Sequence, residues 1–354
     1  MLRRLVMLVV VLGALAGAGA WWAWAQLDAP YRGFDDPEVF VELPAGSSTA
    51  DIAGRLSAMG VVRSPLIFRL AVRLAKADRR LQAGEYRFVD QATPREIIAR
   101  LRRGDTFNHT VTFPEGLTIR EMAAIFEREG LGTADDFIAA AADRSLIADL
   151  DPEATNLEGY LFPSTYSLPR YAGAAGFMRA MVKEFRKVIA TSAVSTPPVT
   201  PADPAAPADP AVAPPIAPTL SLRDRVTLAS LVEKETSSAD ERAIVAAVYM
   251  NRLRLRMALQ CDPTVIYALM LRGRWDGNIR KADLQIDSPY NTYRYPGLPP
   301  GPIASPGRAS LEAARHPADV KYLYFVSKGD GTHVFSTTLA EHNRNVQKYQ
   351  IRKR

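Results

Sequence analysis

The stretch Ala229-Ser-Leu-Val-Glu-Lys-Glu-Thr236 ends an apolar run of helical periodicity with two glutamates. Helical spacing places the second of them, Glu235, on the same face as Leu228, Leu231 and Val232. A carboxyl group on an apolar face is poorly solvated, so its pKa should rise and it can hold a proton near neutral pH. Glu235 is therefore a candidate general acid. The other interpretation is an ordinary helix whose polar side begins here.

The N-terminal residues predict a membrane anchor. Arg3 and Arg4 precede a run from Leu5 to Ala25 that has no charged side chain. As a helix this run would be roughly 31 Å long, about the thickness of a bilayer core. Three tryptophans, Trp21, Trp22 and Trp24, lie near the end of this run, where an aromatic belt is expected. A cleavable signal peptide is the alternative, but its apolar core is normally about 7–15 residues long.

The arginines favour a cytoplasmic N-terminus. We therefore expect a single-pass protein of the cell inner membrane, with the bulk of the chain in the periplasm. Cys261 is the only cysteine, so no intramolecular disulfide can form. Four histidines and no second cysteine argue against a structural zinc site, and we expect neither a metal nor a cofactor. A net charge of +6 outside the cytoplasm favours anionic lipid or wall polymer over nucleic acid as the partner.

An internal repeat relates Phe40–Ala53 to Thr110–Ala123. Each copy reads as a short strand, a Pro-x-Gly turn and a helix that ends at glycine. Residues 64–78 between the copies read as a second helix and residues 83–89 as a strand, so the predicted order is β-α-α-β. Such a module can bind glycans or serve only as a scaffold. Helix N-termini with capping boxes are predicted at Ser48…Asp51, Thr93…Glu96 and Thr118…Glu121.

The rest of the chain alternates helical and irregular segments. Residues 131–190 read as mainly helical, with a loop or short strand at Gly159–Tyr166. Residues 196–219 are rich in proline and alanine, which predicts an extended tether or external loop without catalytic residues. A short hairpin is predicted from residues 322–326 and 333–335. The last helices are predicted at Ser221–Thr236, Asp240–Met257, Pro263–Arg272, Arg308–Arg315 and Thr338–Tyr349.

Four segments of the C-terminal part are rich in amide, hydroxyl and aromatic side chains. They are residues 259–267, 288–293, 297–307 and 333–343. Together with a buried glutamate they have the composition of a surface that binds a polar polymer such as a glycan. Asp262 before Pro263 reads as a helix cap, and Cys261 reads as a packing residue.

These motifs resemble the YceG-like family of membrane-anchored endolytic murein transglycosylases. The resemblance covers roughly residues 35–190 and 220–349 and includes the anchor, whereas the Pro/Ala-rich insertion departs from the family. It rests on Gly159–Tyr166, Val232-Glu-Lys-Glu-Thr236, Asn251-Arg-Leu253, Leu259–Tyr267, Tyr290-Asn-Thr-Tyr293, Gly297–Ile303, Ser310-Leu-Glu-Ala-Ala314, Tyr322–Val326 and Glu341-His-Asn343. The resemblance implies a LysM-like N-terminal module, a catalytic domain that cuts nascent peptidoglycan strands, and a catalytic glutamate at Glu235.

The expected fold class is α+β, with a transmembrane helix, small LysM-like β-α-α-β modules and a mainly helical catalytic domain with a short β-hairpin. Residues 1–27 would form the cytoplasmic tip and anchor, and residues 35–110 the LysM-like module. Residues 111–190 would form the second repeat half with a helical connector, residues 191–219 the insertion, and residues 220–350 the catalytic domain. Peptidoglycan strands are the expected partner, and peptidoglycan synthases are candidate partners.

A glycosidase of the usual kind needs two carboxyl groups, one on each side of the bond that is cut. They lie about 5–5.5 Å apart in retaining enzymes and about 6.5–9.5 Å apart in inverting enzymes. Glu233 is a poor second member because a side chain two residues away along a helix points elsewhere. No motif designates another acid among Asp262, Asp283 and Asp287.

We therefore expect a single-acid mechanism at the bond between N-acetylmuramic acid (MurNAc) and N-acetylglucosamine (GlcNAc). Glu235 would protonate the bridging oxygen, the substrate's N-acetyl group would stabilise C1, and ionised Glu235 would take the proton of the C6 hydroxyl as the 1,6-anhydro ring closes. The residues expected to bind the sugar are Gln260, Tyr290, Asn291, Thr292 and Tyr293. The alternatives are a hydrolytic muramidase and a non-catalytic peptidoglycan-binding scaffold.

Overall fold

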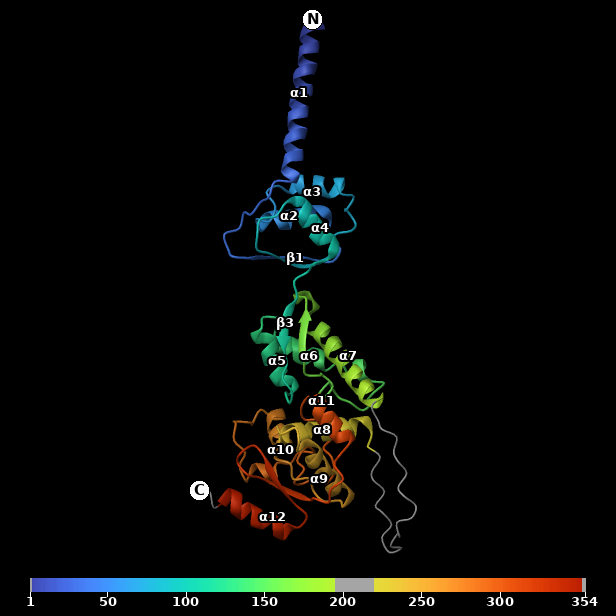
Figure 1. Cartoon of the computed structure of the whole chain (residues 1–354), viewed down its shortest axis with the longest axis vertical. Coiled ribbons are helices and arrows are strands. Elements are labelled where there is room, and N and C mark those ends of the chain that lie inside the picture. Colours follow the sequence, from blue (N-terminus) through green and yellow to red (C-terminus); the bar gives the residue numbers. More distant parts are fainter. Residues whose placement is uncertain (1, 195–219, 352–354) are drawn as a thin grey trace. The chain divides into compact units, whose positions relative to one another are not determined.

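The computed structural model describes residues 2–194 and 220–351, which form a mixed helix-and-sheet protein (Figure 1). The chain divides into two compact units. Residues 1–110 and 167–172 make the N-terminal unit, and residues 111–166 and 173–354 make the C-terminal unit. The insertion expected over residues 191–219 lies outside the described residues from position 195 onward.

The chain begins with the long apolar helix α1, Leu2–Leu27. Its segment Val10–Leu27 has a mean hydropathy of 1.3 and is long and apolar enough to cross a membrane, a property that signal sequences share. Large apolar side chains along the helix are exposed, including Met7, Leu15 and Trp21. Within residues 2–194 and 220–351 α1 is the one helix of that length and apolarity, which agrees with the predicted single-pass anchor.

The N-terminal unit has the predicted β-α-α-β order. Strand β1, Val39–Leu43, pairs antiparallel with β2, Gly84–Phe88, so that Val41 lies opposite Tyr86. Helices α2, Thr49–Ala58, and α3, Pro65–Leu74, lie between these strands in the chain, and α4, Pro94–Arg103, follows them. Their inward faces form one apolar core, which includes Val41, Leu56, Phe68, Tyr86 and Leu101.

Both copies of the predicted repeat form a strand, a turn and a helix. The second copy consists of β3, His109–Thr112, and α5, Ile119–Arg128. Equivalent glycines take the left-handed conformation in the two turns, with φ of 83° at Gly46 and 77° at Gly116. A side chain is strained in that conformation, which explains why both turns use glycine. The predicted capping boxes at Ser48, Thr93 and Thr118 are all formed.

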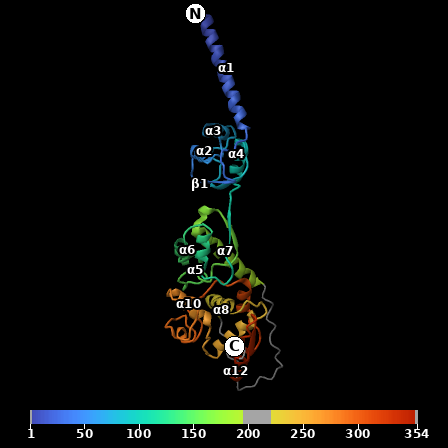
Figure 2. The ribbon, with the colours of Figure 1, turned by 90° about the vertical axis from the view of Figure 1, so that its left-hand side faces the viewer.

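The first part of the C-terminal unit packs helices α5, α6 and α7 together (Figures 1 and 2). Helix α6 is Ala134–Ala141, and α7 is Gly173–Val194. Phe126 of α5 contacts Phe137 of α6 and Phe177 of α7, with ring centroids 5.2 and 5.5 Å apart. The predicted interruption of the helices is confirmed, since residues 159–164 form loop and turns before β4, Thr165–Leu168, which pairs with β3.

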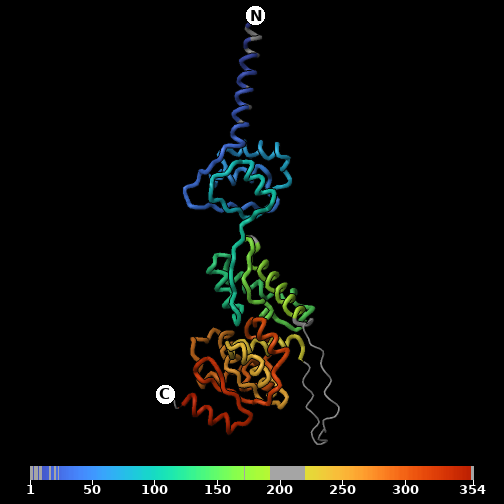
Figure 3. The backbone as a smooth tube through the Cα atoms, viewed as in Figure 1, coloured from blue at the N-terminus to red at the C-terminus, as the bar shows by residue number. Residues whose placement is uncertain are grey.

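The remainder of the C-terminal unit contains the predicted hairpin and the predicted helices, and the helices are the coiled stretches of the yellow to red tube in Figure 3. Strands β5, Tyr324–Ser327, and β6, His333–Ser336, pair antiparallel, with Val326 opposite Val334. The helices are α8, Leu222–Glu235, α9, Arg242–Arg254, α10, Asp262–Leu271, α11, Arg308–Arg315, and α12, Leu339–Val346. Short 3-10 helices occur at Arg144–Ile147, Arg170–Ala172 and Asp283–Gln285, and a π-helical turn occurs at Gln347–Ile351.

Helix α8 is buried more completely than its sequence pattern indicates. Its residues from Val226 to Val232 are all buried, so the helix has no solvated side over two turns. It packs against α9, α10 and α11. The last residue of α8, Glu235, therefore emerges from the interior of the unit.

Candidate functional site

Two weakly acidic donors contact the Glu235 carboxyl group. The Tyr249 hydroxyl of α9 donates a 3.0 Å hydrogen bond to Glu235 Oε2, and Cys261 Sγ lies 3.7 Å from the same oxygen. Burial raises the pKa of Glu235, and the Tyr249 hydrogen bond offsets part of that rise. Burial also raises the pKa values of Tyr249 and Cys261, so both groups keep their protons and act as donors.

The two oxygens of the Glu235 carboxyl group have different surroundings. In the described part of the chain, the hydrogen bonds to this group all reach Oε2. Oε1 is therefore the oxygen that can carry a proton and meet a ligand. The predicted rise in the Glu235 pKa is confirmed, and the geometry suits a carboxyl group that donates a proton from one defined oxygen.

Glu233 is bound to protein groups on both of its oxygens. Its Oε2 accepts a 2.9 Å hydrogen bond from the Gly307 amide, and its Oε1 lies 3.5 Å from the Arg242 guanidinium. The side chain is only 7% exposed. Through these contacts Glu233 holds α8 against α9 and the start of α11. This agrees with the sequence argument that Glu233 is a poor second catalytic carboxylate.

Two of the predicted sugar-binding residues, Asn291 and Thr292, are 0% and 1% exposed. The Thr292 hydroxyl accepts a 3.0 Å hydrogen bond from the Cys261 amide, and the Asn291 amide donates to the carbonyls of Leu284 and Ile286 at 3.0 and 2.8 Å. Their polar groups are already used inside the protein. These hydrogen bonds fix the loop beside Cys261, and direct contact of Asn291 and Thr292 with sugar stays a prediction.

The other three predicted sugar-binding residues are more accessible. Gln260 is exposed and takes a left-handed φ of 51° directly before Cys261. Tyr293 is partly buried, and its hydroxyl donates a 2.5 Å hydrogen bond to Asp262. Tyr290 is also partly buried, with its ring centroid 4.9 Å from that of Tyr267.

Asp262 does not cap α10 as its position before Pro263 suggests. Cys261 occupies the N-cap, and Asp262 is the first residue of the helix, with no side-chain cap hydrogen bond. Its carboxylate instead accepts a hydrogen bond from the Tyr293 hydroxyl. The negative charge of Asp262 contributes to the raised pKa of Glu235.

Sequence reasoning missed Tyr249, Glu241 and His333. Tyr249 lies in an apolar helical stretch and carries no sequence signal that separates it from core residues. His333 lies in one of the polar segments singled out above, but its 2.7 Å contact with Glu241 joins residues far apart in the chain. Cys261, predicted as packing, is 2% exposed and also contacts Glu235.

A second buried carboxyl group, Glu158, lies at the N-terminus of α5. It accepts hydrogen bonds from the Ile119 amide at 3.1 Å and from the Tyr267 hydroxyl at 3.2 Å. Burial raises its pKa to about 8. Glu158 accepts a hydrogen bond from an otherwise free amide at a helix terminus, which explains its burial by a structural role.

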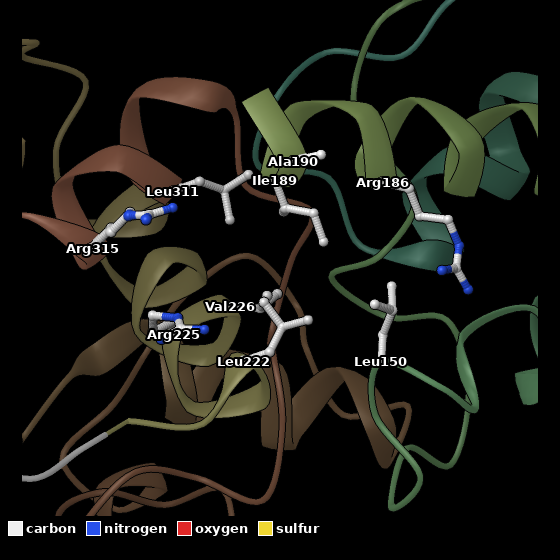
Figure 4. Close-up of a pocket in the computed structure, with 9 residues that line it drawn as sticks. All are labelled: Leu150, Arg186, Ile189, Ala190, Leu222, Arg225, Val226, Leu311 and Arg315. Carbon is white, nitrogen blue, oxygen red and sulfur yellow. The ribbon is translucent and has the colours of Figure 1, made fainter. Parts of the chain in front are cut away.

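A cavity of about 510 Å³ lies away from these groups, between α7, α8 and α11 (Figure 4). The side chains of Ile189, Leu222 and Leu311 form its apolar lining, and arginines lie at its edges. The cavity borders the first half of α8, whereas Glu235 is the last residue of that helix. None of the candidate residues at Glu235 lines it.

Residues 41–348 match the YceG-like family. An endolytic murein transglycosylase of Bacillus subtilis is 33% identical over 347 residues, which cover 94% of this chain and 90% of the relative. One from Streptococcus pneumoniae is 28% identical over 385 residues, covering 98% of this chain and 65% of that longer protein. The crystal structure of a YceG-like protein from Listeria monocytogenes, 30% identical, covers 87% of this chain and 98% of its own, with a TM-score of 0.52. The chain therefore belongs to the YceG-like family.

Proposed function

We propose that this protein is an endolytic murein transglycosylase, a carbon–oxygen lyase that cleaves MurNAc–GlcNAc bonds within nascent glycan strands and so ends their elongation. We infer the activity from relatives that are named endolytic murein transglycosylases and that align with most of this chain. The observation that supports the chemistry is the Glu235 carboxyl group, whose pKa burial raises and whose contacts leave Oε1 available.

The first step is proton donation. Glu235 Oε1 protonates the bridging oxygen, the bond from C1 of MurNAc to that oxygen breaks, and the GlcNAc end leaves with a hydroxyl group. The substrate's own N-acetyl oxygen stabilises the positive charge at C1. This assistance takes the place of a second carboxylate, which suits a site where Glu233 is already bound to Gly307 and Arg242.

The second step closes the anhydro ring. Ionised Glu235 takes the proton of the MurNAc C6 hydroxyl while the C6 oxygen bonds to C1, which restores the protonated carboxyl group. The Tyr249 hydroxyl stabilises the carboxylate between the two steps through its hydrogen bond to Oε2. Gln260 and Tyr293 are the residues proposed to contact the sugar, with Tyr290 beside them.

The remaining assignments concern location. We propose that α1 anchors the protein in the cell inner membrane as a single pass, with the N-terminus in the cytoplasm and the residues that follow α1 in the periplasm. The β-α-α-β part of the N-terminal unit is proposed to be LysM-like, and residues 220–350 to be the catalytic domain. Peptidoglycan synthases are the proposed protein partners, because a nascent strand is made at the same membrane.

The test is to incubate the full-length protein with uncrosslinked glycan strands and to determine the new ends by mass spectrometry. We expect 1,6-anhydroMurNAc ends from the wild type and none from Glu235→Gln. Glu129→Gln, which changes an exposed carboxylate at the end of α5, is the matched control and should behave as wild type. Reducing ends would favour a muramidase, and absence of cleavage by the wild type would favour a binding scaffold.

A further inference from the structure

Glu241, at the N-cap of α9, joins the end of α8 to the start of β6. Its Oε1 accepts a 2.8 Å hydrogen bond from the His333 amide, and its Oε2 lies 2.7 Å from His333 Nδ1. Thr236, the residue directly after Glu235, donates its hydroxyl to the same Oε2 at 3.2 Å. The imidazole of His333 is therefore fixed next to the chain segment that bears Glu235.

These contacts determine the tautomer of His333. Burial raises the pKa of Glu241, but the hydrogen bonds from His333 outweigh that effect, so the net shift is downward and the group is ionised. An ionised carboxylate only accepts hydrogen bonds, so Nδ1 must carry the proton. In the neutral ring, Nε2 then presents a lone pair, and the described residues provide it with no hydrogen-bond partner.

Aromatic contacts connect this imidazole to the group that binds Glu235. The Phe325 ring meets His333 edge-on at 5.4 Å and Tyr249 edge-on at 6.0 Å. The side chains of His333 and Glu241 are 10% and 11% exposed, so the pair is shielded without being sealed from a ligand. Each group of a buried pair gives up its hydration, and the two hydrogen bonds from His333 to Glu241 offset part of that cost.

We propose that His333 is a substrate-positioning residue of the site at Glu235, whose Nε2 accepts a hydrogen bond from a hydroxyl group of the bound glycan. The inference rests on the proposed function. In its neutral form the ring offers only a lone pair at Nε2, so the ligand group that it contacts is a hydrogen-bond donor, whereas a carbonyl or carboxylate oxygen would be repelled. Glu241 acts through His333 by fixing its tautomer and orientation.

The first experiment measures binding in the full-length Glu235→Gln protein, which should not consume its ligand. The probe is the peptide-free tetrasaccharide GlcNAc–MurNAc–GlcNAc–MurNAc. His333→Phe keeps a planar ring but removes both nitrogens, and we expect about a tenfold increase in Kd for the loss of one hydrogen bond. His333→Gln, which can place an acceptor near the position of Nε2, should restore part of the affinity. His316→Phe, at an exposed histidine, is the control and should leave Kd unchanged.

The second experiment needs no change at His333. In the same protein labelled with ¹⁵N-histidine, four imidazoles give signals, because the chain has four histidines. We expect His333 to show a protonated Nδ1 and an unprotonated Nε2, and its Nε2 signal to shift when the tetrasaccharide is added. The signals of His109 and His316 should not move.

The outcomes separate this inference from the proposed function. A protein that binds the tetrasaccharide while its His333 Nε2 signal stays in place overturns the role of His333 alone, even if His333→Phe proves unfolded. An unchanged Kd in a folded His333→Phe protein does the same. A Glu235→Gln protein that does not bind the tetrasaccharide overturns the proposed function together with this inference.

Discussion

The Tyr249 hydroxyl donates a hydrogen bond of 3.0 Å to Glu235 Oε2, which joins the middle of α9 to the last residue of α8. The bond stabilises the ionised carboxyl group, while burial favours the protonated one. Glu235 can therefore pass between both states without moving, as an acid that later acts as a base requires.

Replacing Tyr249 by phenylalanine should separate these two effects. Tyr249→Phe removes the donor, so the pKa of Glu235 rises and its ionised state is less stable. We expect cleavage of uncrosslinked strands to slow about tenfold at neutral pH, the effect of one hydrogen bond of about 1.4 kcal/mol. The basic limb of the pH–rate profile should move to higher pH. An unchanged limb would show that the bond does not act on the titrating group.

Asp262→Asn should move the same limb in the opposite direction. The negative charge of Asp262 raises the pKa of Glu235, so removing it lowers that pKa and the protonated acid is lost at a lower pH. Asparagine can still accept from the Tyr293 hydroxyl, so the local hydrogen bond can persist. The measurement is the pH dependence of kcat/KM. A shift to higher pH would contradict the assignment of Glu235 as the general acid.

Local sequence signals account for what could be predicted. The capping boxes at Ser48, Thr93 and Thr118 each depend on residues three positions apart, and all three are formed. The β5–β6 hairpin follows from two short strands around a Gly-Asp-Gly turn. The apolar face of α8 correctly predicted a raised pKa for Glu235. However, α8 is buried on all sides from Val226 to Val232, so the apolar face by itself did not distinguish Glu235 from Glu233.

Contacts between distant segments account for what could not be predicted. Tyr249 lies in an apolar helix, where a tyrosine usually reads as core, and only the packing of α9 on α8 brings its hydroxyl to Glu235. Asn291 and Thr292 have side chains suited to sugars, but composition does not reveal that neighbouring backbone groups already use them. The N-cap role of Asp262 was wrong because the helix begins one residue earlier than the proline suggests.

The loop role of Thr292 has a direct test. Thr292→Val keeps the shape but removes the hydroxyl, leaving the buried Cys261 amide and Thr264 hydroxyl without this partner. We expect a loss of about 1–3 kcal/mol in unfolding free energy, measured by urea denaturation. Thr292→Ser is the matched control, since it keeps the hydroxyl. If Thr292→Val is as stable as wild type and only KM rises, the direct sugar-binding role first predicted for Thr292 is favoured instead.

Glu158 should make the stability of the C-terminal unit depend on pH. Its pKa is about 8 in the folded protein and near 4.5 in the unfolded chain, so between these values the folded state binds one more proton. Stability therefore falls as pH rises through this interval, by at most about 1.4 kcal/mol per pH unit, and levels off above it. Glu158→Gln cannot ionise but can still accept from the Ile119 amide, so its unfolding temperature should fall less between pH 5 and about 8. Glu153→Gln, at a side chain that is 85% exposed, should retain the wild-type dependence. Parallel pH curves for wild type and Glu158→Gln would mean that Glu158 ionises in the folded protein as readily as in the unfolded chain.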